Sequence, residues 1–388
     1  MKIDDMINKE DFYEILLLTL NSYYDDLIFS AENESVQTKF LNELYVYEKI
    51  NAIIHSKPSK EILSFLKTEY DIRGSILKKV LVNIYLKFKL HSNGYFAEKK
   101  VFYFSLNNHT DFKNILIYPC NKKIRIFNFS NRIVNVVTKY GYPNSAIEKE
   151  INFRLDNLND HIIPIESYGE NWYGERIIDG IPLARIKNLE EYNKFKVAAH
   201  NILLSISKKH NKKNDIESYF IKLENQININ IDKIKFFNEN ISKNVIKLLE
   251  IIRSNIDLKD FQIILTLSHG DLHAGNIWIE NSTNKILIID WETVEIRSEW
   301  YDLFVLHGGF RVTNGIEKMI NSIRRNNIPY FLQSFSLNAI ERIIYVVLME
   351  EIAFRLNDIL SSPHDINLKE FEVYFKRLLS SLLANNIK

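Results

Sequence analysis

Cysteine, glycine and proline are scarce in this sequence. Cys120 is the one cysteine among 388 residues, which excludes an internal disulfide and is typical of a reducing compartment. The 11 glycines and 7 prolines are few in a chain where isoleucine, asparagine and lysine abound. We attribute that bias to codon usage in an AT-rich genome. It blurs the periodicity of helices and strands, because Asn and Lys fill solvent-facing positions in both.

A strong net charge and long apolar runs are also lacking. The 50 Lys and Arg nearly balance the 49 Asp and Glu, so the net charge of +1 gives no global field that would attract nucleic acid or a membrane surface. No apolar run approaches the roughly 18 residues that a membrane-spanning helix needs. Residues 1–6 lack the basic-then-apolar pattern of a secretion signal. We therefore expect a cytoplasmic protein with neither nucleic acid nor membrane as a partner.

The pattern of apolar residues changes along the chain. Residues 1–95 show helical spacing, for example at 40–45 and 76–81, and Ser59 is a candidate helix N-cap. From about 99 to 140, four β-rich runs with short turns predict an antiparallel sheet, and a predicted helix follows at 145–157.

The remainder of the chain is predicted to be mostly helical. Helical patterns cover residues 189–210, 215–253 and 313–385. Asn-Ile alternation at residues 227–231 would indicate a strand by itself, but its flanking segments favour a helix.

The most informative segment is residues 268–278, Ser-His-Gly-Asp-Leu-His-Ala-Gly-Asn-Ile-Trp. It is followed at 285–292 by Lys-Ile-Leu-Ile-Ile-Asp-Trp-Glu, an apolar strand that ends in a carboxylate. Phosphoryl transfer needs one carboxylate near the attacking hydroxyl, and oxygen ligands for the Mg²⁺ that bridges the phosphates. Asp271 suits the first task as catalytic base, and Asn276 with Asp290 suits the second.

At these residues the sequence resembles the aminoglycoside phosphotransferase and choline kinase group of small-molecule kinases, whose fold is similar to that of protein kinases. Protein kinases share the Asp-x-x-x-x-Asn spacing, but after His-Arg, and their metal-binding Asp lies in Asp-Phe-Gly. Here Gly270 replaces that Arg, and Trp291-Glu292 replaces Phe-Gly. The turn at 120–123 also lacks the glycines that cover phosphate in protein kinases. These departures favour the small-molecule branch.

The resemblance implies a bilobal α+β fold of the protein-kinase type. Residues 96–178 would form an N-lobe with an antiparallel β-sheet, and residues 179–388 a helical C-lobe that carries the catalytic and metal-binding loops. Residues 1–95 lie outside the family's motifs and would form a helical N-terminal extension. Its role as a lid, a dimerisation element or a substrate module stays open, as does the oligomeric state.

The resemblance also implies a nucleotide-binding cation before the catalytic segment. Lys139 ends an apolar β-rich run, as does the Lys that binds the α- and β-phosphates in protein kinases. A carboxylate on the following helix usually orients that Lys. Glu148 and Glu150 both qualify, and the apolar residues after Glu150 favour it.

Residues 175–183, Glu-Arg-Ile-Ile-Asp-Gly-Ile-Pro-Leu, resemble the family's linker between its lobes. Backbone N–H and C=O groups of that linker pair with the adenine edge, which makes Glu175 and Ile177 nucleotide-binding candidates. Gly180 and Pro182 also suit a plain turn.

Other side chains of the motif region have expected structural roles. We expect His269 to stabilise the loop backbone and Asp302 to accept hydrogen bonds from it, as in the family. A rival interpretation is a transition-metal site made of His269, Asp271 and His273, because alternate residues of an extended segment project to one side.

The sequence thus predicts a phosphotransferase that uses ATP (or GTP) and Mg²⁺ to phosphorylate a hydroxyl group of a small molecule. Candidate acceptors are an aminoglycoside or other sugar, choline or ethanolamine, and a glycan precursor. Glu350 and Glu351 are candidates for acceptor selection, while Trp300 and Tyr301 are expected in the core or as an aromatic wall. The alternatives are an atypical protein kinase, and a nucleotide-binding pseudokinase or interaction module.

Overall fold

The computed structural model divides the chain into two compact units. Unit 1 consists of Met1–Ile151 and Pro164–Ile178, and unit 2 of Asn152–Ile163 and Asp179–Lys388. Each unit has a hydrophobic core of its own. The structure describes residues 3–7, 11–30, 42–70, 76–90, 92, 94–105, 111–259, 261–312, 314–361 and 368–383.

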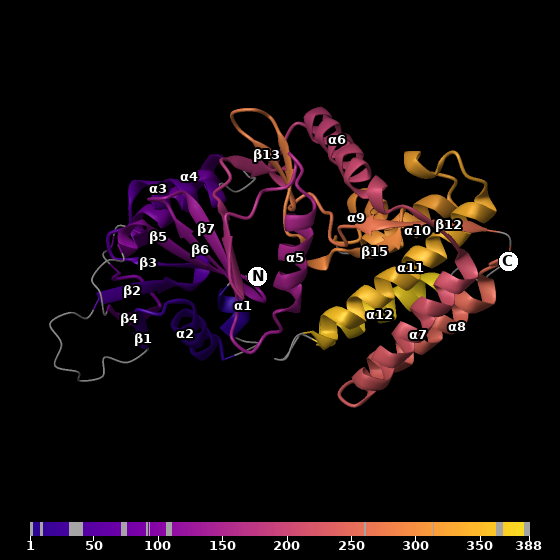
Figure 1. The fold of residues 1–388 in the computed structure, drawn as a ribbon, viewed down its shortest axis with the longest axis horizontal. Coiled ribbons are helices and arrows are strands. Elements are labelled where there is room, and N and C mark those ends of the chain that lie inside the picture. Colours follow the sequence, from indigo (N-terminus) through magenta and orange to yellow (C-terminus); the bar gives the residue numbers. More distant parts are fainter. Residues whose placement is uncertain are drawn as a thin grey trace. The chain divides into compact units, whose positions relative to one another are not determined.

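Unit 1 is built on one nine-stranded sheet (Figure 1) with the strand order β1-β4-β2-β3-β5-β6-β7-β9-β8. Every neighbouring pair is antiparallel. The antiparallel sheet that the sequence predicts is therefore confirmed. The strands are β1 (Leu27–Ser30), β2 (Asn42–Tyr47), β3 (Ala52–His55), β4 (Lys99–Ser105), β5 (Ile115–Pro119), β6 (Lys123–Asn128), β7 (Ile133–Thr138), β8 (Ser167–Tyr168) and β9 (Trp172–Arg176).

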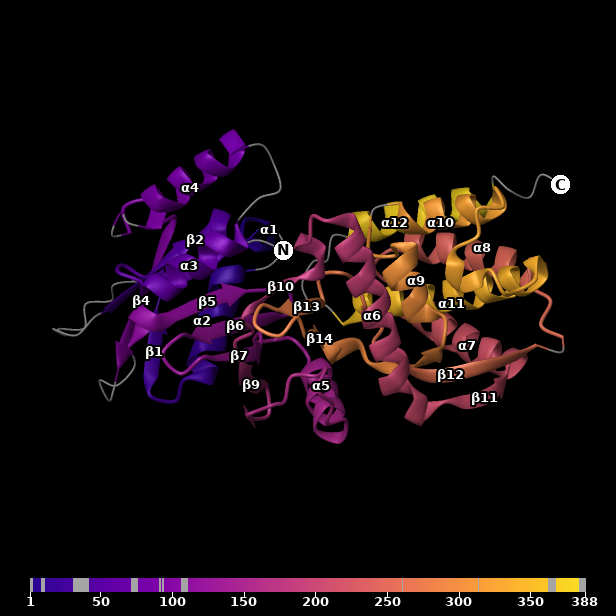
Figure 2. The same cartoon turned by 90° about the horizontal axis from the view of Figure 1, so that it is seen from above.

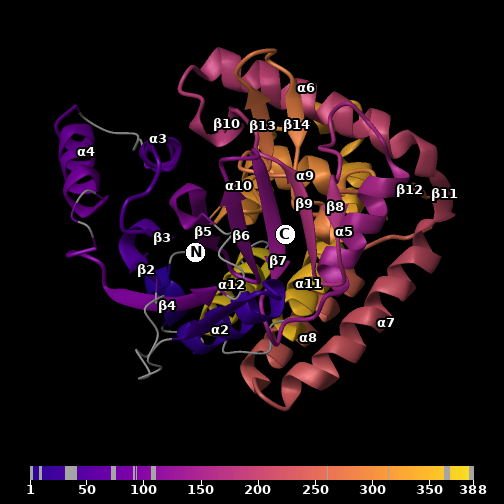
Figure 3. The ribbon, with the colours of Figure 1, turned by 60° about the vertical axis from the view of Figure 1, so that its left-hand side comes forward.

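Helices cover both faces of this sheet. On one face, α1 (Ile3–Ile7) and α2 (Phe12–Tyr23) share a core with strand residues such as Ile124 and Val137. On the other face, α3 (Lys60–Glu69) and α4 (Ile76–Leu90) pack over β2, β3 and β5 (Figure 3). Farther along that second face, α5 (Ser145–Asp156) packs on Val136 of β7. Neighbouring strand residues thus point to opposite sides, as a period of two requires.

The N-terminal 95 residues are not purely helical. Their helices α1 to α4 are present, and Ser59 caps α3 by accepting a hydrogen bond from the Ile62 N–H at 3.5 Å. The helix predicted at residues 40–45 is wrong, because Asn42–Tyr47 forms β2. Both faces of that strand are covered, which gives a continuous apolar run rather than an alternating one. Periodicity alone does not distinguish such a run from a buried helix.

Unit 2 is mainly helical (Figure 2), which confirms the prediction for the region after residue 189. Ile227 and Ile231 are buried on one side of α7, so the Asn-Ile alternation there is helical. The helices are α6 (Leu189–Ser207), α7 (Ile216–Lys235), α8 (Glu239–Asn255), α9 (Tyr301–Gly308), α10 (Gly315–Arg324), α11 (Leu337–Leu360) and α12 (Leu368–Leu383). No helix within the described ranges is both long and apolar enough to cross a bilayer.

Two small sheets complete unit 2. One has the order β10 (Gly180–Pro182), β13 (Ile277–Glu280), β14 (Ile286–Ile288). The other has the order β11 (Lys212–Asp215), β12 (Gln262–Ser268), β15 (Glu295–Ser298). Trp300 and Tyr301 belong to the helical core at 5% and 0% exposure, so the core position expected for them is confirmed. These elements fix both ends of the segment between β12 and β13.

Candidate active site

The predicted catalytic segment is the loop between β12 and β13 in unit 2. Its backbone is held by Asp302, in the first turn of α9. The His269 N–H donates to Asp302 Oδ2 at 2.7 Å, and the Gly270 N–H donates to Oδ1 at 2.9 Å. Asp302 therefore has the structural role expected from the sequence.

The ring of His269 ties this loop to the end of β14. Its Nε2 lies 2.9 Å from the Ile289 carbonyl oxygen, which can only accept, so Nε2 carries the proton. Its Nδ1 then accepts from the Asp271 N–H at 3.2 Å. With both ring nitrogens engaged, His269 braces the loop as expected and is not free to bind the transition metal of the rival interpretation. Within the described ranges, no cluster of three or more His, Cys, Asp or Glu could hold a metal.

Gly270 occupies a position that only glycine fits. Its φ of +85° lies in the left-handed region. A Cβ there would lie 2.6 Å from both the Thr293 carbonyl oxygen and Arg297 Nη1. The arginine that protein kinases carry at this point of the motif has no room here.

Asp271 is half-buried, with 27% of its side chain exposed. Its Oδ1 accepts a 2.6 Å hydrogen bond from Arg311 Nε. Its Oδ2 has only longer contacts, 3.4 Å to Asn276 Nδ2 and 3.5 Å to His273 Nε2. One oxygen is thus committed to a guanidinium, while Oδ2 is able to accept a shorter hydrogen bond from a hydroxyl.

Strand pairing brings the two predicted metal ligands close in space. Ile277 pairs with Ile288, and the Ile289 N–H donates to the Asn276 carbonyl oxygen at 3.0 Å, directly before Asp290. The Asn276 amide nitrogen donates to the Asp271 carbonyl oxygen at 3.0 Å. Asn276 Oδ1 has no hydrogen-bond partner among the residues that the structure describes.

Asp290 has a φ of +67°, which is uncommon for a residue other than glycine. Such backbone strain concentrates at functional sites. The Asn276 amide oxygen and the Asp290 carboxylate are hard oxygen donors, the kind that Mg²⁺ binds. The donor set therefore fits the predicted metal.

Arg311, which the sequence did not indicate, connects Asp271 to a fully buried carboxylate. Its Nη1 lies 2.9 Å from Glu351 Oε2. Glu351 also accepts from Arg355 Nε at 2.8 Å and from the Tyr301 hydroxyl at 2.7 Å. Burial acts to raise the pKa of Glu351, but the two guanidinium groups outweigh it and lower that pKa. No sequence pattern identifies Arg311, which lies 40 residues after Asp271.

The adjacent Glu350, the other candidate for acceptor selection, is also buried. Glu350 braces β15 by accepting from the Ser298 N–H at 2.5 Å and the Ser298 hydroxyl at 2.7 Å. The Tyr219 hydroxyl donates to it at 2.6 Å. Burial raises the pKa of Glu350, because these partners compensate the lost solvation only in part.

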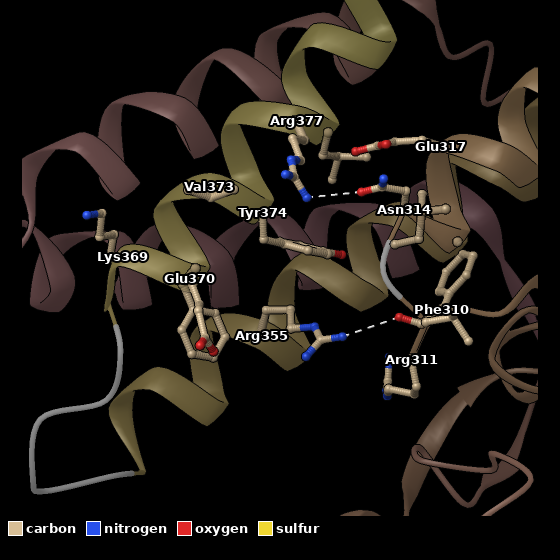
Figure 4. A pocket seen from close by; sticks show the side chains of 15 residues that line it. Phe310, Arg311, Asn314, Glu317, Arg355, Lys369, Glu370, Val373, Tyr374 and Arg377 are labelled. Carbon is tan, nitrogen blue, oxygen red and sulfur yellow. Dashed lines mark hydrogen bonds between the residues drawn. The ribbon is translucent and has the colours of Figure 1, made fainter. Parts of the chain in front are cut away.

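A cavity of about 540 Å³ opens beside Arg311 (Figure 4). Charged side chains line it: the cations Arg311, Arg355, Lys369 and Arg377, and the carboxylates Glu317 and Glu370. Arg355 donates through Nε to Glu351 at 2.8 Å and through Nη2 to the Phe310 carbonyl oxygen at 3.4 Å. In the described part of the chain, Arg355 Nη1 has no hydrogen-bond partner. Arg377 donates to Asn314 Oδ1 at 3.0 Å.

Unit 1 holds the residues predicted to bind the nucleotide phosphates. Glu150 is fully buried whereas Glu148 is exposed. A buried carboxylate needs a compensating cation, which favours Glu150 over Glu148 as the partner of a lysine. Glu150 Oε2 lies 3.4 Å from Nζ of Lys123, a residue that the sequence did not indicate. Lys139 Nζ lies 3.2 Å from Met6 Sδ.

The two linker candidates lie at the end of β9. The Ile177 N–H donates to the Arg132 carbonyl oxygen at 2.7 Å, so this donor is engaged within the chain. Glu175 is paired with Val134 of β7. In unit 2, Gly180 begins β10, where a Cβ would lie 2.4 Å from the Ile279 carbonyl oxygen.

No family model matches the sequence, and no curated protein matches it. Among solved structures, the chain is similar to an ethanolamine kinase from Plasmodium vivax, with a TM-score of 0.44, 13% identity, and coverage of 83% of this chain and 94% of that one. It is similar to a choline/ethanolamine kinase family protein from Mesorhizobium loti, with a TM-score of 0.41, 10% identity, and coverage of 72% and 90%. The ADP-bound aminoglycoside phosphotransferase APH(2'')-Ib gives a TM-score of 0.42, 12% identity, and coverage of 68% and 90%.

Proposed function

We propose that the protein is a phosphotransferase that uses ATP (or GTP) and Mg²⁺ to phosphorylate a hydroxyl group of a small molecule. The observation that carries this proposal is the arrangement around one loop of unit 2. That loop presents a half-buried carboxylate, Asp271, beside Asn276, and the strand pair that follows, β13 and β14, brings Asp290 back near Asn276.

In the proposed reaction, Asp271 Oδ2 accepts the hydrogen bond of the acceptor hydroxyl and then its proton. The hydroxyl oxygen forms a bond to the γ-phosphorus, and the bond to the bridging oxygen breaks, so that the nucleoside diphosphate leaves with the electron pair. Arg311 holds Oδ1 and so fixes the rotamer of Asp271. Bound Mg²⁺ would neutralise phosphate charge, and Asn276 Oδ1 with the Asp290 carboxylate would hold it.

The cavity beside Arg311 supports a small acceptor rather than a protein. Its volume of about 540 Å³ lies in the range typical of small-molecule sites. Four of its six charged side chains are cationic. Asp271 and Glu351 pair with Arg311 and Arg355, whereas the hydrogen-bond partner of Arg377 is the neutral Asn314. Because like charges repel in a partly desolvated cavity, we propose that the acceptor carries a carboxylate or phosphate group, which favours it over a polycationic aminoglycoside.

The test is phosphate transfer by the full chain to a panel of hydroxy acids, sugar phosphates, sugars, amino alcohols and aminoglycosides. We expect Asp271→Asn to lower kcat by roughly 10²- to 10⁴-fold, the usual contribution of a positioned proton acceptor. Nucleotide affinity should change little, because Asp271 is not among the proposed metal ligands. Asp160→Asn makes the same change in the same unit at a side chain that is 93% exposed, and it is the matched control. Near-normal turnover by Asp271→Asn would contradict the proposal, and nucleotide binding without transfer to any acceptor would favour a pseudokinase.

A further inference from the structure

The buried carboxylate of α5 has a lysine partner on a strand other than the predicted one. We propose that Lys123, at the start of β6, is the lysine that binds the nucleotide phosphates, in place of Lys139 beyond the end of β7. This inference rests on the proposed function, because it assigns the cation of the same reaction.

The alternation of side chains along the strands separates the two lysines. Ile124 and Val137 point to the face that α1 and α2 cover. Lys123 precedes Ile124 by one residue and therefore points to the opposite face, where α5 lies. Lys139 follows Val137 by two residues and returns to the face of α1 and α2.

The contacts of Lys123 agree with this assignment. Its Nζ lies 3.4 Å from Glu150 Oε2, and its side chain is 9% exposed while that of Glu150 is 0% exposed. The other carboxylate oxygen of Glu150 accepts from the Tyr173 hydroxyl at 3.0 Å. A buried carboxylate with a second fixed donor holds a lysine in one position, which phosphate binding requires.

The contacts of Lys139 indicate a structural role. Its Nζ lies 3.2 Å from Met6 Sδ of α1 and 5.6 Å from the ring centroid of Phe12 in α2. The next residue continues this attachment, since the Tyr140 N–H donates to Thr19 Oγ1 of α2 at 2.9 Å. Lys139 thus joins the end of β7 to the N-terminal helices.

Register explains how a lysine on β6 could replace one on β7. Lys123 is the direct cross-strand partner of Thr138, the last residue of β7 and the one that shares its face. Directly paired side chains occupy neighbouring space, about 5 Å apart at Cβ. Lys123 also follows the turn at 120–122, where the Cys120 N–H donates to the Lys123 carbonyl oxygen at 2.8 Å. In the kinases that the sequence resembles, the loop that covers the phosphates corresponds to this turn.

The test compares the Mg-ATP dissociation constants of the wild type, Lys123→Met and Lys139→Met, measured directly by calorimetry on the full chain. A charged hydrogen bond contributes enough that its loss weakens binding by about 10- to 100-fold, and we expect that loss in Lys123→Met. Lys139→Met should bind Mg-ATP as the wild type does but melt at a lower temperature. The reverse result, with affinity lost only in Lys139→Met, would overturn the assignment and leave the proposed function standing. A wild type that binds no nucleotide would overturn both.

A relocation variant guards against loss of folding in Lys123→Met. In Lys123→Met/Thr138→Lys, a lysine returns to the same face and the same partner, Glu150, from the neighbouring strand. We expect this double variant to recover most of the lost affinity. If Lys123→Met does not fold, Lys123→Gln keeps a hydrogen bond to Glu150 and removes only the charge. Wild-type affinity in Lys123→Gln, or no recovery in a folded double variant, would contradict the proposal.

Discussion

The catalytic loop of unit 2 and the sheet of unit 1 differ in how far sequence spacing determines the position of a side chain. In the loop, Asp271 and Asn276 are five residues apart and joined by a 3.0 Å hydrogen bond from the Asn276 amide to the Asp271 backbone. In the sheet, a shift of one residue moves a side chain to the opposite face. Thr138 points to the face of α5 with its partner Lys123, and Lys139, one residue later, points to the face of α1 and α2.

The difference explains why a motif suffices to propose roles for the loop residues, while the proposed role of Lys123 depends on the structure. A loop motif contains many of its own contacts, because the His269 and Asn276 side chains both bond to the backbone of Asp271. A strand residue has a function only through its face, its register and the helix opposite, which are distant in sequence. The role of a strand residue therefore cannot be assigned from its spacing in the sequence alone.

If local contacts alone maintained the loop, the distant Glu351 would be dispensable. The structure predicts instead that Glu351→Gln destabilises the protein by about 3–5 kcal/mol, because Arg311 and Arg355 lose the carboxylate that compensates their buried charge. Denaturant unfolding of the full chain measures this. Glu350→Gln is the matched control. The Glu350 carboxylate accepts its hydrogen bonds from Tyr219 and Ser298 rather than from an arginine, so its loss should cost about 1 kcal/mol or less.

The pH dependence of stability distinguishes the same two carboxyls. The pKa of Glu351 is lowered in the folded protein, so its contribution is complete above the unfolded pKa of about 4.3 and is lost as the pH falls through the folded pKa. The wild type should therefore lose more stability than Glu351→Gln below about pH 4. The pKa of Glu350 is raised, which gives a contribution of the opposite sign. If the wild type and Glu351→Gln lose the same stability at low pH, the two arginines do not hold Glu351 ionised.

Much of the fold followed from the sequence because its elements have a clear period or clear boundaries. The strands β4 to β7, the helix α5 and all helices of unit 2 except α9 lie where the apolar pattern predicted them. β2 was missed because Leu44 and Val46 are buried on one face and Tyr45 and Tyr47 on the other, which removes the alternation. A strand covered on both sides has no polar face to reveal its period.

The site was predictable where the chemistry lies within one motif. Asp302 and His269 have their expected structural roles, and the paired strands β13 and β14 bring Asn276, directly before β13, near Asp290, two residues after β14. Arg311 was not predictable, since an arginine in a loop before α10 has no pattern that relates it to Asp271. The engagement of the Ile177 N–H by the Arg132 carbonyl oxygen likewise depends on strand register, which spacing does not give.

Gly270 tests whether the loop geometry is as tightly set as its contacts indicate. Gly270→Ala should destabilise the protein by roughly 1–3 kcal/mol and lower kcat, because alanine is strained at a φ of +85° and its Cβ would clash with the Thr293 carbonyl oxygen. Gly275→Ala in the same loop is the control. There the nearest atoms to the Cβ belong to the His273 ring, a side chain that can shift more easily than the backbone. The melting temperature and kcat of both variants are measured. Equal changes in Gly270→Ala and Gly275→Ala would mean that the loop tolerates a side chain at position 270.

The cavity proposed to bind the acceptor depends on the fold, as the sheet does, because its residues come from segments far apart in the sequence. Arg377 on α12 reaches Asn314 before α10, at the edge of this cavity. Arg377→Gln should raise KM for an anionic acceptor about two- to fivefold, as expected for an exposed charge, and leave kcat unchanged. Lys376→Gln removes an adjacent exposed charge that does not line the cavity and should not change KM. If both variants, or neither, raise KM, or if Arg377→Gln lowers it, the charge of the cavity wall does not select an anion, and the acceptor is then to be sought among neutral or cationic alcohols.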